Sequence, residues 1–100
     1  MRIVKKKTIT DQYARFPNVK QSLEEWLADT ERAVWTSPQD VKNRYPNASI
    51  LAGNRVVFNI KGNTYRLIVS IAYRSQVVYI KFFGTHAEYD KIDALSVNDF

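Results

Sequence analysis

The 100-residue chain contains no cysteine, a single histidine, three glycines and three prolines. Without cysteine, disulfide scaffolds, iron–sulfur clusters and cysteine-ligated zinc sites are excluded. The scarcity of glycine and proline excludes collagen-like and low-complexity chains. The longest apolar runs, such as residues 77–80, are far shorter than the roughly 20 residues that span a bilayer. We therefore expect a cytoplasmic globular protein that needs no metal or other cofactor.

What the chain does contain is typical of one globular domain. Its residues are 45% hydrophobic and 25% charged. One hundred residues suffice for one hydrophobic core of ordinary size and leave no room for a second. No repeat or linker interrupts the sequence. We expect a single domain over residues 1–100, in which residues 96–100 form a loose tail.

The net charge of +5 is concentrated in one part of the chain. Residues 55–81 contain five basic residues and no acidic residue, whereas the rest of the chain is balanced. The five basic residues are Arg55, Lys61, Arg66, Arg74 and Lys81. Such a segment indicates an anionic partner, most often nucleic acid, and a solvated basic surface without a partner is the alternative.

The first third of the sequence has the periodicity of helices after a short strand expected over residues 1–4. Thr8 and Asp11 have the spacing of a capping signal and predict a helix that Pro17 ends. A second helix is predicted over residues 19–34. Its expected apolar face consists of Leu23, Trp26, Leu27, Thr30 and Val34.

From Ser37 onward the pattern changes towards strands. Ser37 followed by Pro38 predicts a short helix that ends near Arg44, because proline is favoured at the first helical position. Residues 47–54 are rich in turn formers and are expected to be an irregular connection. Strands with a period of two are then predicted over residues 56–60, 65–73 and 77–83, with turns at residues 62–63 and 75–76.

Two-residue turns between these strands predict the pairing of the sheet. Asn59 is expected opposite Arg66, Arg66 opposite Thr85, and Ser70 opposite Lys81. One face is then wholly apolar, and its burial, at roughly 1.5–3 kcal/mol for each large side chain, is expected to drive folding. Its members are Val56, Phe58, Ile60, Tyr65, Leu67, Val69, Ile71, Tyr73, Val78, Ile80 and Phe82. This pattern predicts an α+β fold with the N-terminal helices packed on one face of an antiparallel sheet.

The other face of the predicted sheet is basic and carries no acidic residue. Its expected members are Asn59, Lys61, Arg66, Ser70 and Lys81 among Val57, Ile68, Tyr79 and Phe83. Cations bind phosphates and aromatic rings stack on bases, so this face predicts a nucleic-acid surface. An ordinary solvated face is the alternative.

The only histidine, His86, directly follows the third of these strands. In a helix expected over residues 86–95, His86, Tyr89 and Asp90 would share one side. Cleavage of RNA by its own 2′-OH needs a base, an acid for the leaving 5′-oxygen, and cations for the charged phosphorane. His86 suits either proton role at neutral pH. A histidine that only supports a turn is the alternative.

Two sequence blocks carry a family resemblance. Residues 58–66 read Phe-Asn-Ile-Lys-Gly-Asn-Thr-Tyr-Arg, and residues 84–90 read Gly-Thr-His-Ala-Glu-Tyr-Asp. In this order and spacing, and together with the earlier helices, the chain resembles the HigB-type toxins of the RelE superfamily over nearly its whole length. The resemblance implies a toxin of a type II toxin–antitoxin system, with helices on one side of a curved antiparallel sheet. It also implies a metal-independent mRNA interferase that usually cuts messages on the translating ribosome.

The resemblance implies partners and, together with the reading of the sheet, site residues. The partners would be a HigA-like helix-turn-helix antitoxin, mRNA and the ribosome, with DNA reached only through the antitoxin and no membrane. The expected catalytic residues are Arg66, Lys81, His86 and Tyr89. The expected RNA-binding residues are Asn59, Lys61, Asn63, Tyr79 and Lys91, of which Lys91 is also an alternative group for proton transfer.

A competing hypothesis is a non-catalytic regulator that binds RNA or the ribosome through the same basic face. Both hypotheses need Arg66 and Lys81, whereas only the nuclease needs His86 and Tyr89 for turnover. In a third hypothesis the basic face docks an acidic protein, and an acidic antitoxin would satisfy it as well.

Overall fold

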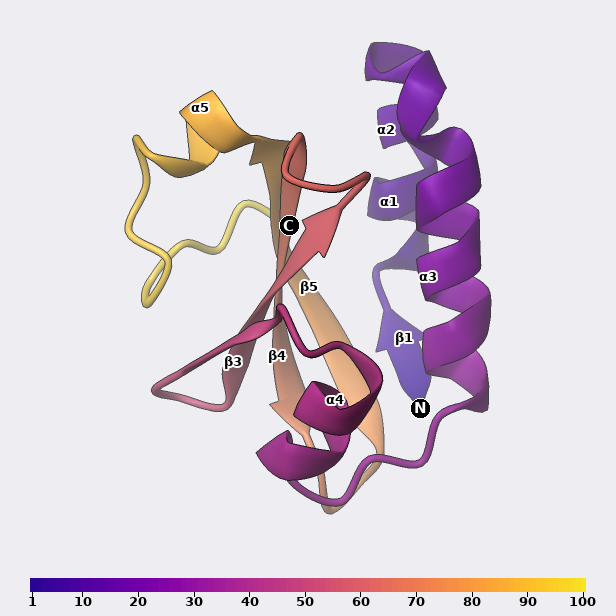
Figure 1. Ribbon diagram of the computed structural model, residues 1–100, viewed down its shortest axis with the longest axis vertical. Coiled ribbons are helices and arrows are strands. Elements are labelled where there is room, and N and C mark those ends of the chain that lie inside the picture. Colours follow the sequence, from indigo (N-terminus) through magenta and orange to yellow (C-terminus); the bar gives the residue numbers. More distant parts are fainter.

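The computed structural model describes all 100 residues, and its centre is a five-stranded sheet. The N-terminal helices pack on one face of this sheet, and the C-terminal segment crosses the other, which we call the outer face (Figure 1). The strand order is β1-β5-β4-β3-β2. The strands are β1 (Arg2–Val4), β2 (Ser49–Leu51), β3 (Arg55–Ile60), β4 (Tyr65–Ala72) and β5 (Val77–Thr85). Only the β1–β5 pair is parallel, so the predicted α+β class with helices on one face is confirmed.

The helices follow the predicted order but differ at their ends. They are α1 (Lys6–Thr10), α2 (Gln12–Arg15), a 3₁₀ turn (Pro17–Val19), α3 (Lys20–Arg32), α4 (Pro38–Arg44) and α5 (His86–Tyr89). The predicted cap at Thr8 is wrong: α1 begins at Lys6, directly after Lys5 adopts a positive φ of 68°. The Thr8 hydroxyl instead donates to the carbonyl of Lys5 within the first turn. No helix has the length and apolar character needed to cross a bilayer.

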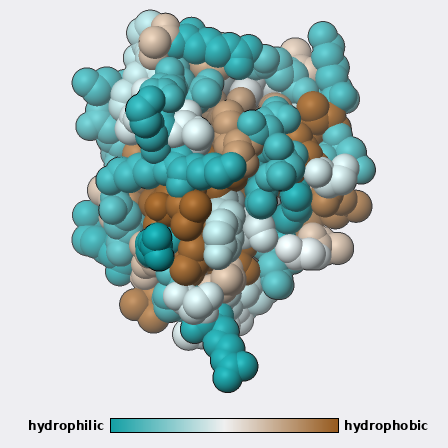
Figure 2. Space-filling model, turned by 180° about the vertical axis from the view of Figure 1, so that it is seen from behind, coloured by the Kyte–Doolittle hydropathy of each residue, from teal (hydrophilic) through white to brown (hydrophobic).

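The main core lies between the helices and the inner face of the sheet. Helix α3 buries Leu23, Trp26, Leu27 and Thr30, as its periodicity predicts. Val34 is 74% exposed, because α3 ends at Arg32 and the chain is extended from Ala33. Seen from behind, apolar surface forms patches that hydrophilic side chains separate (Figure 2). The apolar side chains of the sheet are therefore buried mainly inside the molecule.

The segment 47–54 is not an irregular connection. It contains β2, which pairs with β3 from Ser49 opposite Val57 to Leu51 opposite Arg55. The chain reverses between the two strands through Gly53 and Asn54, both of which have positive φ. A three-residue strand surrounded by turn formers has too short a pattern to be recognised from the sequence.

The predicted register is right for one hairpin and wrong for the other. Asn59 lies opposite Arg66, as expected. Between β4 and β5, however, Arg66 lies opposite Gly84 and Ser70 opposite Tyr79. The β4–β5 turn is longer than two residues, since the last pair is Ala72 with Val77, and a bulge beside Ile68 and Val69 then shifts the register again.

The bulge exchanges the faces of two neighbouring phenylalanines. Phe83 packs into the main core, where its ring stacks on Tyr65 with centroids 5.6 Å apart. Phe82 belongs to a second cluster on the outer face, with Val57 and Ile68. We predicted the reverse, because strict alternation cannot place the extra residue of a bulge.

The C-terminal segment lies across the outer face. A helix is expected over residues 86–95, but the observed helix α5 is limited to His86–Tyr89. Beyond it, the Arg55 guanidinium donates to the carbonyls of Ala94 and Val97 at 3.1 and 2.7 Å. Residues 96–100 also make contacts: the backbone N–H of Asp99 donates to the Lys81 carbonyl, and Phe100 packs against the main core.

Candidate functional site

The centre of the outer face is apolar and covered rather than open and basic. Val57, Ile68 and Phe82 are each at most 5% exposed. The residues that pack against this cluster are Leu51, Tyr89, Ile92, Ala94 and Val97. This cover divides the expected basic surface into two groups. The Arg66 group consists of Arg66 with Asn59, Asn63 and Tyr89, and the Lys81 group consists of Lys81 with Tyr79.

Arg66 is the most buried charged residue in the chain, at 9% exposure. Its guanidinium donates to the carbonyls of Asn63, at 3.0 Å, and Tyr65, at 3.2 Å. It takes part in no ion pair. A buried cation whose contacts are neutral oxygens keeps its full charge for an incoming anion, and such a charge is costly to bury unless it is paired.

Helix α5 is fixed beside Arg66 by a capping box. The Glu88 backbone N–H donates to the Thr85 hydroxyl at 3.2 Å, and the Thr85 N–H donates to the Glu88 carboxylate at 2.9 Å. The same carboxylate pairs with Arg15 of α2. The Thr85 N–H and the Arg15 guanidinium lower the pKa of Glu88. These contacts anchor a helix of four residues that is too short to be stable alone.

Gly84 makes room for this arrangement. A Cβ atom at position 84 would lie 2.9 Å from the Glu88 Oε1 and 2.9 Å from the Phe82 Cζ. A side chain at position 84 would therefore force the Glu88 carboxylate and the Phe82 ring to shift.

Helix α5 brings His86 next to Asp90, as the predicted helical spacing requires. His86 Nδ1 lies 3.1 Å from the Asp90 Oδ2, which leaves Nε2 without a protein partner. The backbone N–H of His86 donates to the Thr64 carbonyl, which ties the start of α5 to the β3–β4 turn. The Tyr89 ring lies 5.9 Å from the guanidinium carbon of Arg66. The structure thus brings Arg66 and Tyr89 together at the end of the sheet where His86 begins α5.

Lys81 lies in the second group, at the bulge in β5. Its ammonium is 5.8 Å from the centre of the Tyr79 ring and donates to the Asn98 side chain at 3.2 Å. Lys81 lies three positions before Gly84, the partner of Arg66, on β5, a span of about 10 Å along the strand. The structure therefore does not bring Lys81 into the Arg66 group.

The other expected RNA-binding residues divide between the two faces. Asn63 accepts from Arg66, and Asn59 is the cross-strand partner of Arg66. Lys61 lies in the turn with a positive φ of 53°, and its ammonium donates to the carbonyl of Asn18 on the helical side of the sheet. Lys91 is exposed just beyond α5.

Sequence reasoning missed the residues that hold α5 in place. Thr85 and Glu88 have the Thr-x-x-Glu spacing of a capping box, so the signal was present in the sequence. The pairing of Arg15 with Glu88, 73 residues apart in the chain, has no local signal. No group of three or more His, Asp or Glu side chains is arranged to hold a metal ion.

The comparisons with known proteins agree on one family. The family model HigB_toxin, described as a RelE-like toxic component of a toxin–antitoxin system, matches residues 19–92. The mRNA interferase toxin HigB of Escherichia coli K12 is 26% identical over 97 residues, which cover 95% of this chain and 93% of that protein. The mRNA interferase HigB of Shigella flexneri gives the same values. The mRNA interferase HigB of Escherichia coli O6:H1 is 23% identical over 94 residues, with 92% and 91% covered.

Proposed function

Since the chain belongs to the HigB family of RelE-like toxins, the toxic components of toxin–antitoxin systems, we propose that it is an mRNA interferase. Its substrate is then messenger RNA and its reaction is endonucleolytic cleavage. The observation that carries the proposal is the buried, unpaired guanidinium of Arg66 next to the helix that presents His86 and Tyr89. A phosphodiester of the RNA would supply the negatively charged partner that Arg66 does not have within the protein.

The side chains support a reaction in which the substrate's own 2′-OH is the nucleophile. His86 accepts the 2′-OH proton through Nε2, while Asp90 orients the ring through Nδ1. The 2′-oxygen bonds to phosphorus as the bond from phosphorus to the 5′-oxygen breaks, and Tyr89 gives the leaving oxygen its proton. Arg66 stabilises the charge on the phosphorane. The products are a 2′,3′-cyclic phosphate and a 5′-hydroxyl, and no step requires a metal ion.

The remaining basic residues extend the RNA path. Lys81 and Tyr79 are a separate cation and ring on the outer face, suited to a neighbouring phosphate and base. Asn59 and Asn63 lie beside Arg66, and exposed Lys91 adds positive charge near α5. Lys61 makes its contact on the helical side and extends the positive potential around the turn.

A family of toxic components also implies a cognate antitoxin. We propose a HigA-like helix-turn-helix antitoxin, through which DNA is contacted indirectly, and action in the cytoplasm on the translating ribosome. The family resemblance supports these finer assignments. We further propose that residues 1–100 act as one domain, for which the continuous core is the support.

The direct test is cleavage of mRNA by the purified full chain, with and without translating ribosomes, and analysis of the new ends. We expect 2′,3′-cyclic phosphate and 5′-hydroxyl ends, and cleavage of free RNA, where it occurs, that persists in EDTA. A double variant with His86→Ala and Tyr89→Phe should lose at least about 10²-fold in rate. Tyr73→Phe, in which a remote tyrosine loses the same hydroxyl, should cleave normally.

Three outcomes would count against the proposal. New ends with a 5′-phosphate would show attack by water and overturn the mechanism. A double variant that is folded and cleaves at the wild-type rate would move the chemistry away from α5. Tight RNA or ribosome binding without any cleavage would support the non-catalytic regulator instead.

A further inference from the structure

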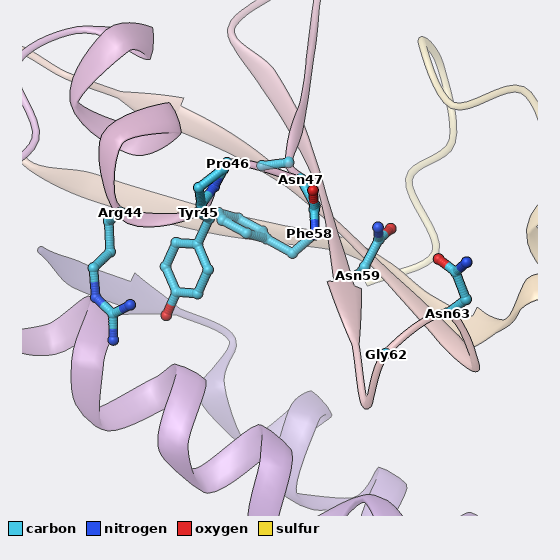
Figure 3. A pocket seen from close by; sticks show the side chains of 9 residues that line it. Arg44, Tyr45, Pro46, Asn47, Phe58, Asn59, Gly62 and Asn63 are labelled. Carbon is cyan, nitrogen blue, oxygen red and sulfur yellow. The ribbon is translucent and has the colours of Figure 1, made fainter.

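A cavity of about 440 Å³ opens between the end of α4 and the tip of the β3–β4 hairpin (Figure 3). Its walls include Tyr45 and Asn47 after α4, Phe58 and Asn59 on β3, and Asn63 in the turn. The volume is within the range of about 300–1,000 Å³ that is typical of sites for small ligands. The mechanism proposed above leaves this cavity unused.

The fold creates the cavity because β2 is short. Its pairing with β3 extends only to Val57, so the edge of β3 beyond that residue has no neighbouring strand. The chain arrives at β2 through a turn in which the Ala48 N–H donates to the Tyr45 carbonyl at 3.0 Å. Proline at position 46 favours this turn, and Asn47 occupies its other corner beside the open edge.

The chemistry of the walls fits a neutral, polar ligand. Three asparagine amides line the cavity, and no acidic residue does. Neither Asn47 nor Asn59 uses its side chain in a hydrogen bond within the protein, so both amides are available. The charge of Arg44 is engaged by Asp29, at 3.0 Å. An amide offers both a donor and an acceptor, the combination that pairs with the edge of a nucleobase.

The cavity lies next to the proposed phosphate contact. Asn59 is directly opposite Arg66 in the sheet, and Asn63 accepts from the Arg66 guanidinium while lining the cavity. A strand of RNA whose phosphate is on Arg66 would therefore carry its adjoining nucleotide towards these amides.

We propose that this cavity is a subsite for one unpaired nucleobase of the RNA, and that Asn47 is a specificity-determining residue in it. The inference rests on the proposed function, because it takes the ligand to be RNA. Asn59 and Asn63 contact the same base from the hairpin side, and Arg66 holds its phosphate.

The test is an NMR titration of the ¹⁵N-labelled full chain with each of the four nucleoside 5′-monophosphates and with ribose 5-phosphate. Ribose 5-phosphate should shift the signals of Arg66 alone. At least one nucleotide should also shift the side-chain amides of Asn47 and Asn59, and bind about 5-fold or more tightly than ribose 5-phosphate. Asn47→Ala should remove that advantage and leave ribose 5-phosphate binding unchanged.

Asn43→Ala is the matched control, because Asn43 is an exposed asparagine of α4 that does not line the cavity. It should titrate like the wild type. Equal affinities for nucleotides and ribose 5-phosphate would overturn the subsite, as would an Asn47→Ala variant that keeps the nucleotide advantage. The titration needs no cleavage: a chain that passes it but never cuts RNA refutes the proposed function, whereas a chain that cuts RNA but fails it refutes the subsite.

Discussion

The guanidinium of Arg66 lies 5.9 Å from the Tyr89 ring, across the space between β4 and α5, and no carboxylate neutralises it. A phenol ring next to a cation offers modest stabilisation and supplies no counter-charge. The chain therefore carries an electrostatic cost at this position. Costs of this kind are common where a protein is arranged to bind a ligand rather than to be most stable.

Replacing Arg66 separates its role in binding from its role in folding. Arg66→Met should weaken RNA binding and reduce the log–log salt slope by about 0.7, the contribution of one phosphate contact on a single strand. The free energy of unfolding should stay equal or increase, because methionine removes a buried charge that has no counter-ion. RNA titrations at several salt concentrations and urea unfolding measure the two effects.

Arg74→Ala is the control for this experiment, since Arg74 is exposed at the opposite end of β4. Its effect on affinity should be small. A lower stability of Arg66→Met, with RNA binding intact, would show that Arg66 is a structural residue.

The Thr85 N–H and, after it, the Arg15 guanidinium lower the pKa of Glu88, which predicts a pH-dependent stability. Folding lowers the pKa of Glu88 below its ordinary value of 4.5, so its charge stabilises the folded state above that pH and ceases to do so as the pH falls through the lowered pKa. Glu88→Gln should keep the capping bond and lose the charge. Urea unfolding should show the variant less stable by about 0.5–1 kcal/mol at pH 7, and this deficit should shrink as the pH falls below 4.5.

Glu24→Gln serves as the comparison, because Glu24 makes only a loose pair with Lys20, at 3.9 Å. Its stability should differ little from the wild type at either pH. If the deficit of Glu88→Gln persists unchanged in acid, the effect of Glu88 comes from its hydrogen bonds and not from its charge.

The sequence was informative where patterns are local. The periodicity of α3 and the pairing of Asn59 with Arg66 were correct, because one depends on helical spacing and the other on a short turn. The predicted pairing of β4 with β5 was wrong. Either of the adjacent residues Phe82 and Phe83 can occupy an apolar position, so the sequence gives no sign of the bulge. The cover over the outer face was also missed, since it arises from contacts between Arg55 and a segment some 40 residues away.

Replacing Gly84 with alanine, the smallest residue that has a Cβ atom, should already affect stability and activity. In Gly84→Ala the new Cβ would meet the Glu88 carboxylate and the Phe82 ring at 2.9 Å, so these two side chains must shift. We expect a loss of about 1–3 kcal/mol in unfolding free energy, as for overpacked sites. RNA cleavage should fall as well, because a displaced Glu88 carboxylate no longer caps the helix that carries Tyr89. Thermal unfolding and cleavage rates measure both.

Gly53→Asn is a suitable control, because position 53 is open and asparagine tolerates a positive φ. It should remain close to the wild type in both measurements. Normal cleavage by Gly84→Ala would mean that the capping contact of Glu88 does not matter for activity.

The bulge in β5 predicts that Arg66 and Lys81 bind different phosphates. They belong to groups separated by the apolar cluster of Val57, Ile68 and Phe82, and lie about 10 Å apart along the strand direction. Contacts at that distance with no shared partner contribute independently. In a double-mutant cycle, Arg66→Ala and Lys81→Ala should therefore lower the RNA-binding free energy additively, within about 0.5 kcal/mol, and each should reduce the salt slope by about 0.7. A coupling energy well above this value, or a salt slope that the second substitution leaves unchanged, would mean that both cations act on one phosphate and that Lys81 moves towards Arg66 when RNA binds.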